Sequence, residues 1–321
     1  MTIAFVHSHR SFLPELDAYS HFFSAYGIQT TEIRSSEIAG SRADLFWHFM
    51  GTDSGHAKKD VVTIHEYGSA SVPPFRKWKD LIKRSLSSKP GFRIFLNEYV
   101  KESMGFTDDV PFGFRDMGIF PRMQGPTQPE KVFDFIYTGS LGPQRNIRSL
   151  LRVFTTPRLK DHSLLVLGKD YDRLSRRYDT YQNIRFKGPV PYSSVAEWLH
   201  KARFAINFMP DKEPFNQQSA TKFLEYASMN IPIISSDYAW VKKFQQQYGG
   251  AYFFLRDDLS NFTWENVNGY AYGFPDLSEW SWEKQIRKSG VLEFIQGKFP
   301  ELVFPVRRGP SDLPLTSVHI P

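Results

Sequence analysis

The stretch from Gln217 to Ser236, QQSATKFLEYASMNIPIISS, carries side chains that suit an anionic ligand with hydroxyl groups. A short polar run leads into a predicted helix near Thr221, and Lys222 and Glu225 stand three residues apart on one face of it. The N–H groups of a helix N-terminus favour a phosphate, and a carboxylate one turn later can accept hydrogen bonds from sugar hydroxyls. The same spacing fits an ordinary surface ion pair worth about 0.2–0.5 kcal/mol, so the surrounding chain has to decide between the two interpretations.

A second candidate for a phosphate site begins at Tyr137 with YTGSLGPQRNIRSLL, which predicts a strand, a glycine loop and a helix. Gly139 and Gly142 permit close approach of the backbone, and Arg145 lies near the helix start, where a diphosphate would be held. The loop is neither a P-loop nor a GxGxxG dinucleotide fingerprint. Paired with the helix start at 219–225 in one sheet, it favours a nucleotide diphosphate.

Alternating strands and helices must position these residues. Apolar runs predict first-half strands at 2–6, 28–34, 44–49 and 61–64, and second-half strands at 133–137, 163–167, 183–186, 204–208, 232–235 and 251–255. Helical segments separate most of them, which is typical of parallel sheets covered by helices. The fold class is therefore α/β.

Composition divides the chain into two domains. The proline- and glycine-rich stretch at 108–130 predicts a linker, so we expect one Rossmann-like domain at 1–122 and another at 130–279. A late helical segment at about 280–300 is expected to pack back on the first domain, with an extended tail at 300–321.

Three predicted strands of the first domain end in loops that carry histidine: HSHR, WHFMG and HEYGS. Ligands bind beyond the carboxyl ends of such strands, so these loops predict a second face of a site. A metal site built from His7, His9, His48, His65 and Glu66 is conceivable. No HxxxH or HExxH helix is present, so we expect no metal there.

Residues 75–93 are basic and amphipathic. Trp78, Ile82 and Leu86 stand among seven cations, and Asp80 is the one acidic residue of the stretch. The pattern predicts an interfacial helix on an anionic membrane surface, and it also fits a solvated helix that packs one apolar stripe on its domain.

The whole composition narrows the function classes. The 321 residues contain no cysteine, which excludes disulfides, thiolate metal sites and cysteine nucleophiles. The net charge of +6 is mild, and no nucleic-acid-binding motif is visible, so we expect no nucleic-acid partner. Neither a signal peptide nor a membrane span is apparent, so we expect a cytoplasmic protein, peripheral on the inner face of the cytoplasmic membrane.

Three motifs resemble the GT-B glycosyltransferases, close to the retaining family 4 group. SATKFLEYASMNIPIISS is similar to the family's donor helix and strand, YTGSLGPQRN to its diphosphate loop, and VVTIHEYGSAS to the strand that ends in the active-site histidine. The resemblance covers roughly residues 1–255. It implies two Rossmann-like domains with parallel sheets facing a central cleft, a nucleotide-sugar donor on the second domain and an acceptor on the first.

The resemblance also implies roles for individual residues. His65, Arg145 and Lys222 would be catalytic, with the two cations balancing the charge of the departing diphosphate. Contacts to the donor would come from Gly139, Ser140, Gly188, Val190, Gln217, Thr221 and Glu225. The acceptor side would hold His7, Arg10, Glu15 and Glu66. No cofactor or metal is implied beyond the nucleotide sugar.

The chain departs from the family pattern at three places. Gln217 stands where a glutamate usually precedes Glu225 by eight residues, Ser140 replaces a common arginine, and the first loop lacks paired glycines. The resemblance implies a glycosyltransferase of the hexosyltransferase type, probable retention of configuration, and an acceptor that is a cell-envelope polysaccharide, a lipopolysaccharide or a lipid-linked glycan. Alternatives are a catalytically silent GT-B domain acting as a regulator or scaffold, a GT-B sugar-phosphate epimerase, and an inverting enzyme with Glu15 or Glu66 as the base.

Overall fold

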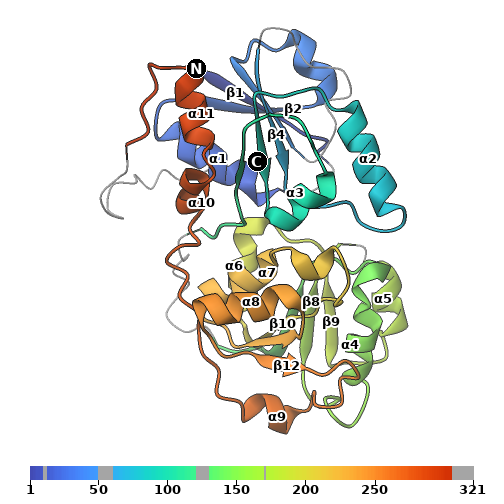
Figure 1. The fold of residues 1–321 in the computed structure, drawn as a ribbon. Helices are drawn as coiled ribbons and strands as arrows, with labels where there is room; N and C mark the ends of the chain where they lie inside the picture. Colours follow the sequence, from blue (N-terminus) through green and yellow to red (C-terminus); the bar gives the residue numbers. More distant parts are fainter. Residues whose placement is uncertain (10–12, 50–60, 121–129, 170, 306–321) are drawn as a thin grey trace.

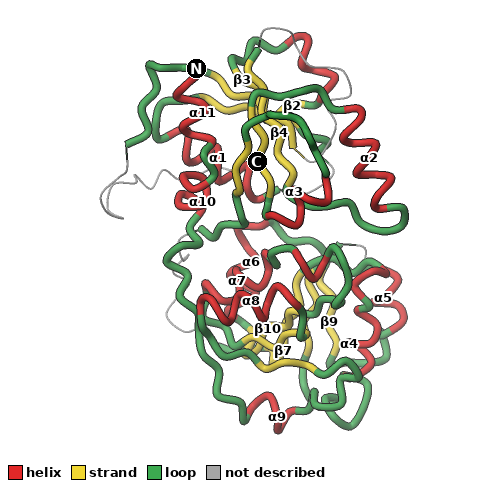
Figure 2. Tube along the Cα trace, in the orientation of Figure 1, coloured by secondary structure: helices red, strands yellow, loops and turns green. Residues whose placement is uncertain are grey.

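The protein is described by a computed structural model that covers residues 1–9, 13–49, 61–120, 130–169 and 171–305. Two α/β domains lie one above the other in Figure 1, each built on a separate sheet. Strands and helices alternate along both domains (Figure 2). The predicted fold class, with two parallel-sheet Rossmann-like domains, is confirmed.

The first sheet has six parallel strands in the order β2-β1-β3-β4-β5-β6. Their bounds are β1 Thr2–Val6, β2 Gln29–Ile33, β3 Leu45–Phe49, β4 Val62–Tyr67, β5 Phe92–Phe95 and β6 Phe112–Phe114. The helices between them are α1 Pro14–Ser24, α2 Arg76–Leu86 and α3 Glu98–Met104, with a 3₁₀ turn at Ser35–Gly40. The central strands are apolar and buried because helices cover the sheet.

The second sheet also has six parallel strands, in the order β12-β11-β10-β7-β8-β9. Their bounds are β7 Phe133–Thr138, β8 Leu164–Leu167, β9 Ile184–Lys187, β10 Ala202–Asn207, β11 Ile233–Ser236 and β12 Phe253–Leu255. The helices are α4 Ile147–Val153, α5 Asp172–Arg177, α6 Tyr192–His200, α7 Thr221–Ser228, α8 Ala239–Tyr248 and α9 Trp264–Asn268. Short 3₁₀ turns lie at Pro143–Arg145 and Phe215–Gln217.

The chain returns to the first domain at its end. Helices α10 Trp282–Lys288 and α11 Val291–Lys298 replace the single late helix that the sequence predicts. Gly290, at φ +73°, separates them, a conformation that glycine adopts without steric cost. Ile286, Val291 and Ile295 are buried in the same core as the strands of the first sheet. The two red helices of Figure 1, α10 and α11, therefore belong spatially to the N-terminal domain.

Strand β6 corrects the predicted linker. It lies inside the stretch at 108–130, where proline and glycine suggested only a connection, and it extends the first sheet by one edge strand. A Cβ on Gly113 would lie 1.7 Å from the backbone oxygen of Ser289, so only glycine allows the end of α10 to approach this strand. The glycine that looked like a linker residue thus closes the contact between the C-terminal segment and the sheet.

Candidate functional site

Two segments of the second domain meet at the carboxyl ends of its central strands. The loop after β7 leads into α4, and the loop after β10 leads into α7. The Tyr226 hydroxyl joins them, because it lies 2.8 Å from Thr138 Oγ1 and accepts the Thr138 N–H at 3.0 Å. This contact brings the start of the glycine loop beside the helix that carries Lys222 and Glu225.

The glycine loop folds closely around the Lys222 side chain. Gly139 has φ +120°, and a Cβ built on it would lie 3.9 Å from Lys222 Cδ. The neighbouring strand also requires glycine, since a Cβ on Gly168 would lie 2.3 Å from the Gly139 oxygen. The loop backbone can therefore approach both β8 and a ligand, as the sequence predicted for a phosphate loop.

Lys222 and Arg145 are two enclosed cations on the same site. Lys222 Nζ donates to the Phe208 carbonyl at 3.2 Å and lies 4.3 Å from the centre of the Tyr137 ring. The Arg145 guanidinium stacks on Phe215 at 4.4 Å and contacts the Met209 sulfur. Among the residues that the structure describes, neither cation forms a salt bridge with a carboxylate.

The electrostatics of this pair favour an anion. Burial lowers the pKa of Lys222 well below its ordinary value, and the positive charge of Arg145 lowers it further. Burial also lowers the pKa of Arg145. Both shifts mean that the protein destabilises the charged forms, so a ligand with two or more negative charges would restore them. The start of α7 adds to this preference, because its N-cap residue Ala220 has no side chain with which to cap the helix.

Glu225 lies on the same helix but faces another partner. Its Oε1 accepts a hydrogen bond from the Tyr192 hydroxyl at 2.8 Å. Burial raises the Glu225 pKa to about 7, against the opposing effect of that hydrogen bond. Tyr192 begins α6, directly after the bend at Gly188 and Val190 that the sequence predicts to hold the base. The geometry thus joins the predicted ribose carboxylate to the predicted base segment.

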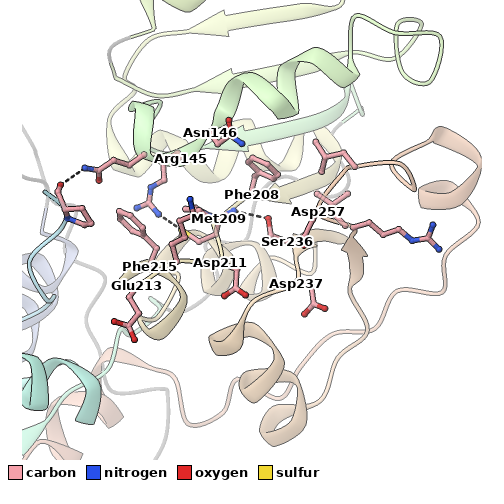
Figure 3. Close-up of a pocket in the computed structure, with 17 residues that line it drawn as sticks. Arg145, Asn146, Phe208, Met209, Asp211, Glu213, Phe215, Ser236, Asp237 and Asp257 are labelled. Carbon is pink, nitrogen blue, oxygen red and sulfur yellow. Dashed lines mark hydrogen bonds between the residues drawn. The ribbon is translucent and has the colours of Figure 1, made fainter. Parts of the chain in front are cut away.

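A pocket of about 770 Å³ opens beside Arg145 (Figure 3). Its walls come from the start of α4 and from the segments after β10, β11 and β12. Its apolar part is lined by Phe208, Met209 and Phe215. The Ser236 hydroxyl oxygen accepts a hydrogen bond from the Met209 N–H at 3.1 Å. Pro73 of the first domain also reaches it. The pocket is large enough for a small ligand and is formed almost entirely by the second domain.

The loop between β10 and α7 is held against the first domain. Arg76 Nη2 lies 2.8 Å from Glu213 Oε2, and Tyr99 donates to the same carboxylate at 3.3 Å. Asn97 Nδ2 donates to the Gln217 backbone oxygen at 2.9 Å. The Gln217 position, where a glutamate is usual, is therefore at the domain junction, while Glu213 is engaged by Arg76.

Other donor-side predictions lie near this junction. Thr221 is the first residue of α7, and the Ser219 hydroxyl two residues earlier donates to Asp116 of the first domain. Ser140 is exposed in the glycine loop, where its carbonyl accepts from the Tyr137 hydroxyl at 2.9 Å. The structure thus gathers the predicted donor residues along one side of the interdomain junction.

Two acidic residues of the first domain lie inside it. The Glu66 carboxylate accepts from Arg115 Nε at 2.9 Å, from Trp47 Nε1 at 2.9 Å and from the Tyr19 hydroxyl at 3.1 Å. Glu15 lies 3.7 Å from the same guanidinium, and burial raises its pKa. Glu66, Arg115 and Glu15 are all at most 4% exposed. Both carboxylates are therefore enclosed within the first domain, where Arg115 is their shared partner.

The predicted histidines occupy different environments. His65 lies within β4, 1% exposed, and its ring centre is 5.1 Å from that of His48 in β3. The strand runs three residues beyond the predicted end, which places this imidazole in the interior. His7 follows β1 and pairs with Glu32 at 2.8 Å. Arg10 lies outside the described residues.

Sequence reasoning missed Tyr192, Phe215 and Arg115. Tyr192 and Phe215 hold the donor-side groups through contacts between segments far apart in the chain. Tyr192 follows the predicted base segment directly, which is the one local signal that pointed to it. Arg115 lay in the predicted linker, where an arginine beside phenylalanines gives no sign of a buried partner.

Comparisons with known proteins agree with this arrangement. Residues 132–262 match the family model described as Glycosyl transferases group 1. No curated protein sequence matches the chain. Sucrose-phosphate synthase from Thermosynechococcus elongatus is similar in structure, with a TM-score of 0.64, 10% identity, and coverage of 93% of this chain and 99% of that one.

Two further solved structures show the same fold. HepE of Anabaena, in complex with UDP, has a TM-score of 0.59 and 11% identity, and the match covers 93% of this chain and 98% of that one. AviGT4, a glycosyltransferase involved in avilamycin A biosynthesis, has a TM-score of 0.55 and 11% identity, with coverage of 93% and 96%. Residues 132–262 thus match a group 1 glycosyltransferase domain, and the chain as a whole shares the two-domain GT-B fold of these solved structures.

Proposed function

We propose that the protein transfers a sugar from a nucleotide-diphosphate donor to a cell-envelope polysaccharide, a lipopolysaccharide or a lipid-linked glycan, with retention of configuration. The single observation that supports the donor class is the pair of enclosed cations, Arg145 and Lys222, whose pKa values are both lowered. A bound diphosphate would supply both cations with a negatively charged partner. HepE, which shares the fold, binds UDP, so a uridine nucleotide is the first donor to test.

The residues suggest how the reaction proceeds. The bond between the anomeric carbon and the donor phosphate oxygen breaks, and an acceptor hydroxyl oxygen bonds to that carbon. Negative charge grows on the departing diphosphate, where Arg145 and Lys222 stabilise it. A departing phosphate oxygen takes the proton of the acceptor hydroxyl, which balances the exchange. Glu225, oriented by Tyr192, accepts hydrogen bonds from the ribose hydroxyls and holds the nucleotide in place.

The outer face of α2 supports the proposal that the acceptor lies at a membrane. Trp78, Ile82 and Leu86 are 66%, 52% and 58% exposed, and Phe75 before the helix is 75% exposed. At 100° per residue Trp78, Ile82 and Leu86 share one face of the helix. The acidic Asp80 turns inward and accepts from the Ser71 N–H at 3.2 Å. Arg76 pairs with Glu213, while the exposed Lys77, Lys79 and Arg84 can meet anionic lipid, which is worth about 1 kcal/mol per cation near the surface. None of the described helices is long and apolar enough to cross a bilayer.

A thermal-shift panel with UDP, GDP, ADP, dTDP and CMP tests the donor class. Binding to the native state alone stabilises it by about 2.7 kcal/mol at a ligand concentration of one hundred times Kd. We expect one nucleoside diphosphate to give the largest shift and its monophosphate a much smaller one. A panel without any shift would refute the donor site. Incubation of the best donor with lipid-linked or polysaccharide acceptors then separates an enzyme, which consumes the donor, from a silent scaffold, which binds it unchanged.

A further inference from the structure

Three metal-ligating side chains meet at the carboxyl end of β1, outside the donor pocket. His7 is the first residue after the strand, His9 follows two residues later, and Glu32 lies in the neighbouring strand β2. One ligand atom from each lies within 4.8 Å of the other two. His7 Nε2 and Glu32 Oε2 are 2.8 Å apart, and the centres of the His7 and His9 rings are 3.9 Å apart.

The register of the parallel strands builds this cluster. Phe5 pairs with Glu32, and Val6 with Ile33. Side chains alternate between the two faces of a sheet, so His7 lies on the face of Phe5 and therefore of Glu32. The His7 N–H continues the ladder to the Ile33 carbonyl at 3.1 Å, which fixes the direction of the imidazole at the sheet edge.

His9 reaches the cluster through an unusual backbone conformation. Its φ is +55°, in the left-handed region that residues with a Cβ rarely adopt. This turn carries the His9 ring back onto His7 and not away from the sheet. Such backbone strain concentrates at ligand sites.

The charge and access of the cluster suit a cation. Glu32 is 44% exposed at its side chain and His9 is exposed, so an ion can enter from solvent, while His7 is 8% exposed and anchored.

We propose that His7, His9 and Glu32 bind one divalent transition-metal ion of the zinc and cobalt class, at a site separate from the donor pocket. Imidazole and carboxylate ligands suit these ions, and three protein ligands leave a fourth position for water or an acceptor oxygen. On binding, His7 Nε2 gives up its hydrogen bond to Glu32, and the 3.3 Å contact from the His9 N–H to His7 Nδ1 opens as Nδ1 takes the ring proton.

Calorimetric titration of the full chain with Zn²⁺ and Co²⁺ at pH 7.5 tests the site. We expect one ion per chain with a Kd in the micromolar range, weakening as the pH falls because the imidazoles must be neutral. Bound Co²⁺ should show the visible bands of a low-coordinate nitrogen and oxygen site without thiolate charge transfer, since the chain has no cysteine.

Two variants and a matched control locate the ion. His9→Asn keeps a residue that tolerates the left-handed conformation, and Glu32→Gln removes only the charge. Each should weaken Zn²⁺ binding about tenfold or more, an effect typical of lost ligands and their partners. His21→Ala, an exposed histidine of α1, should leave it unchanged.

The same samples separate this site from the donor site. The thermal shift with UDP should be equal in wild type, His9→Asn and Glu32→Gln. The proposal is overturned if wild type binds neither ion with a Kd below about 1 mM, the range of weak sites. It is also overturned if both variants bind Zn²⁺ like the wild type.

Discussion

Lys222 and Glu225 stand one turn apart in α7, yet their charged groups turn to different partners: Lys222 Nζ to the Phe208 carbonyl at 3.2 Å, and Glu225 Oε1 to the Tyr192 hydroxyl at 2.8 Å. The i,i+3 spacing is therefore not used for the surface ion pair that it also suggests. One side chain turns toward the glycine loop after β7 and the other toward α6. A ligand bound along this helix face would meet a cation and a carboxylate with separate tasks.

Lys222→Met should make the unliganded protein more stable. The folded-state pKa of Lys222 lies below its unfolded value, so the folded protein binds fewer protons and gains stability as the pH rises toward 10.5. Methionine has no charge for the protein to bury, and its side chain fills a volume similar to that of lysine. We expect about 1 kcal/mol of added stability at pH 7, within the range seen when buried charges are replaced by apolar side chains. Urea unfolding measures it, with exposed Lys160→Met as the neutral control. A large loss of stability would show that the charge is satisfied in the free protein.

UDP binding should take up a proton at a pH between the depressed pKa of Lys222 in the free protein and its pKa in the complex. The diphosphate raises the Lys222 pKa from its depressed free value, so affinity is greatest below the bound pKa and falls as the pH rises through it. Glu225, with a pKa of about 7, is already ionised at pH 8 and contributes little. Calorimetry in two buffers with different ionisation enthalpies gives the proton count. Uptake that persists in Lys222→Met would assign the proton to another group.

Tyr192→Phe should weaken UDP binding and move its pH dependence. The Tyr192 hydroxyl lowers the Glu225 pKa, so its removal raises that pKa further above 7 and leaves less carboxylate at neutral pH. A hydrogen bond to a charged group contributes about 1.5–3 kcal/mol, so a loss of affinity of about tenfold is expected. Titrations from pH 6 to 8.5 follow the midpoint, with half-exposed Tyr181→Phe as the control. An unchanged midpoint would remove Tyr192 from the site.

The outer face of α2 should bind anionic vesicles. We expect flotation with liposomes that contain phosphatidylglycerol and little with neutral ones, because both the basic residues and the exposed Trp78 contribute. Trp78→Ala together with Lys77→Glu should abolish the difference, while Lys160→Glu on the second domain should not. Equal flotation with both vesicle types would show that this face binds lipid through its apolar side chains alone. No flotation with either type would contradict the membrane proposal.

Glu66→Gln should destabilise the fold. It leaves Arg115, which is 0% exposed, without its main partner, and breaking a buried pair in this way costs about 3–5 kcal/mol. The readout is the midpoint of urea unfolding, and Glu37→Gln on the surface is the control. If Glu66 were instead a catalytic base at the acceptor, stability would hold and turnover alone would fall.

The sequence predicts the sheets and the donor helix well because their signals are local. Apolar runs mark most strands within one or two residues, and the pattern around Arg145 marks strand β7, the loop after it and helix α4. Strand β6 escaped because its three residues lie among proline and glycine, and its identity depends on pairing with β5 and on the contact at Gly113.

The partners of each side chain were harder to predict, because they come from distant segments. Nothing near Glu225 in the sequence indicates Tyr192, thirty-three residues away, and nothing near Glu66 indicates Arg115, forty-nine residues away. His65 was expected at a strand end, but β4 runs on to Tyr67 and buries it. Residue types thus indicate the chemistry of a site, while the packing of the two domains decides which groups remain available to a ligand.

The central claim is that Arg145 and Lys222 together hold a diphosphate, and calorimetric titration with UDP and UMP tests it most directly. We expect wild type to bind UDP at least about tenfold more tightly than UMP, which corresponds to about 1.4 kcal/mol for the additional phosphate. The double variant Arg145→Gln, Lys222→Met should lose this preference while retaining its fold by circular dichroism. A preference for UDP that survives in the folded double variant would contradict the account.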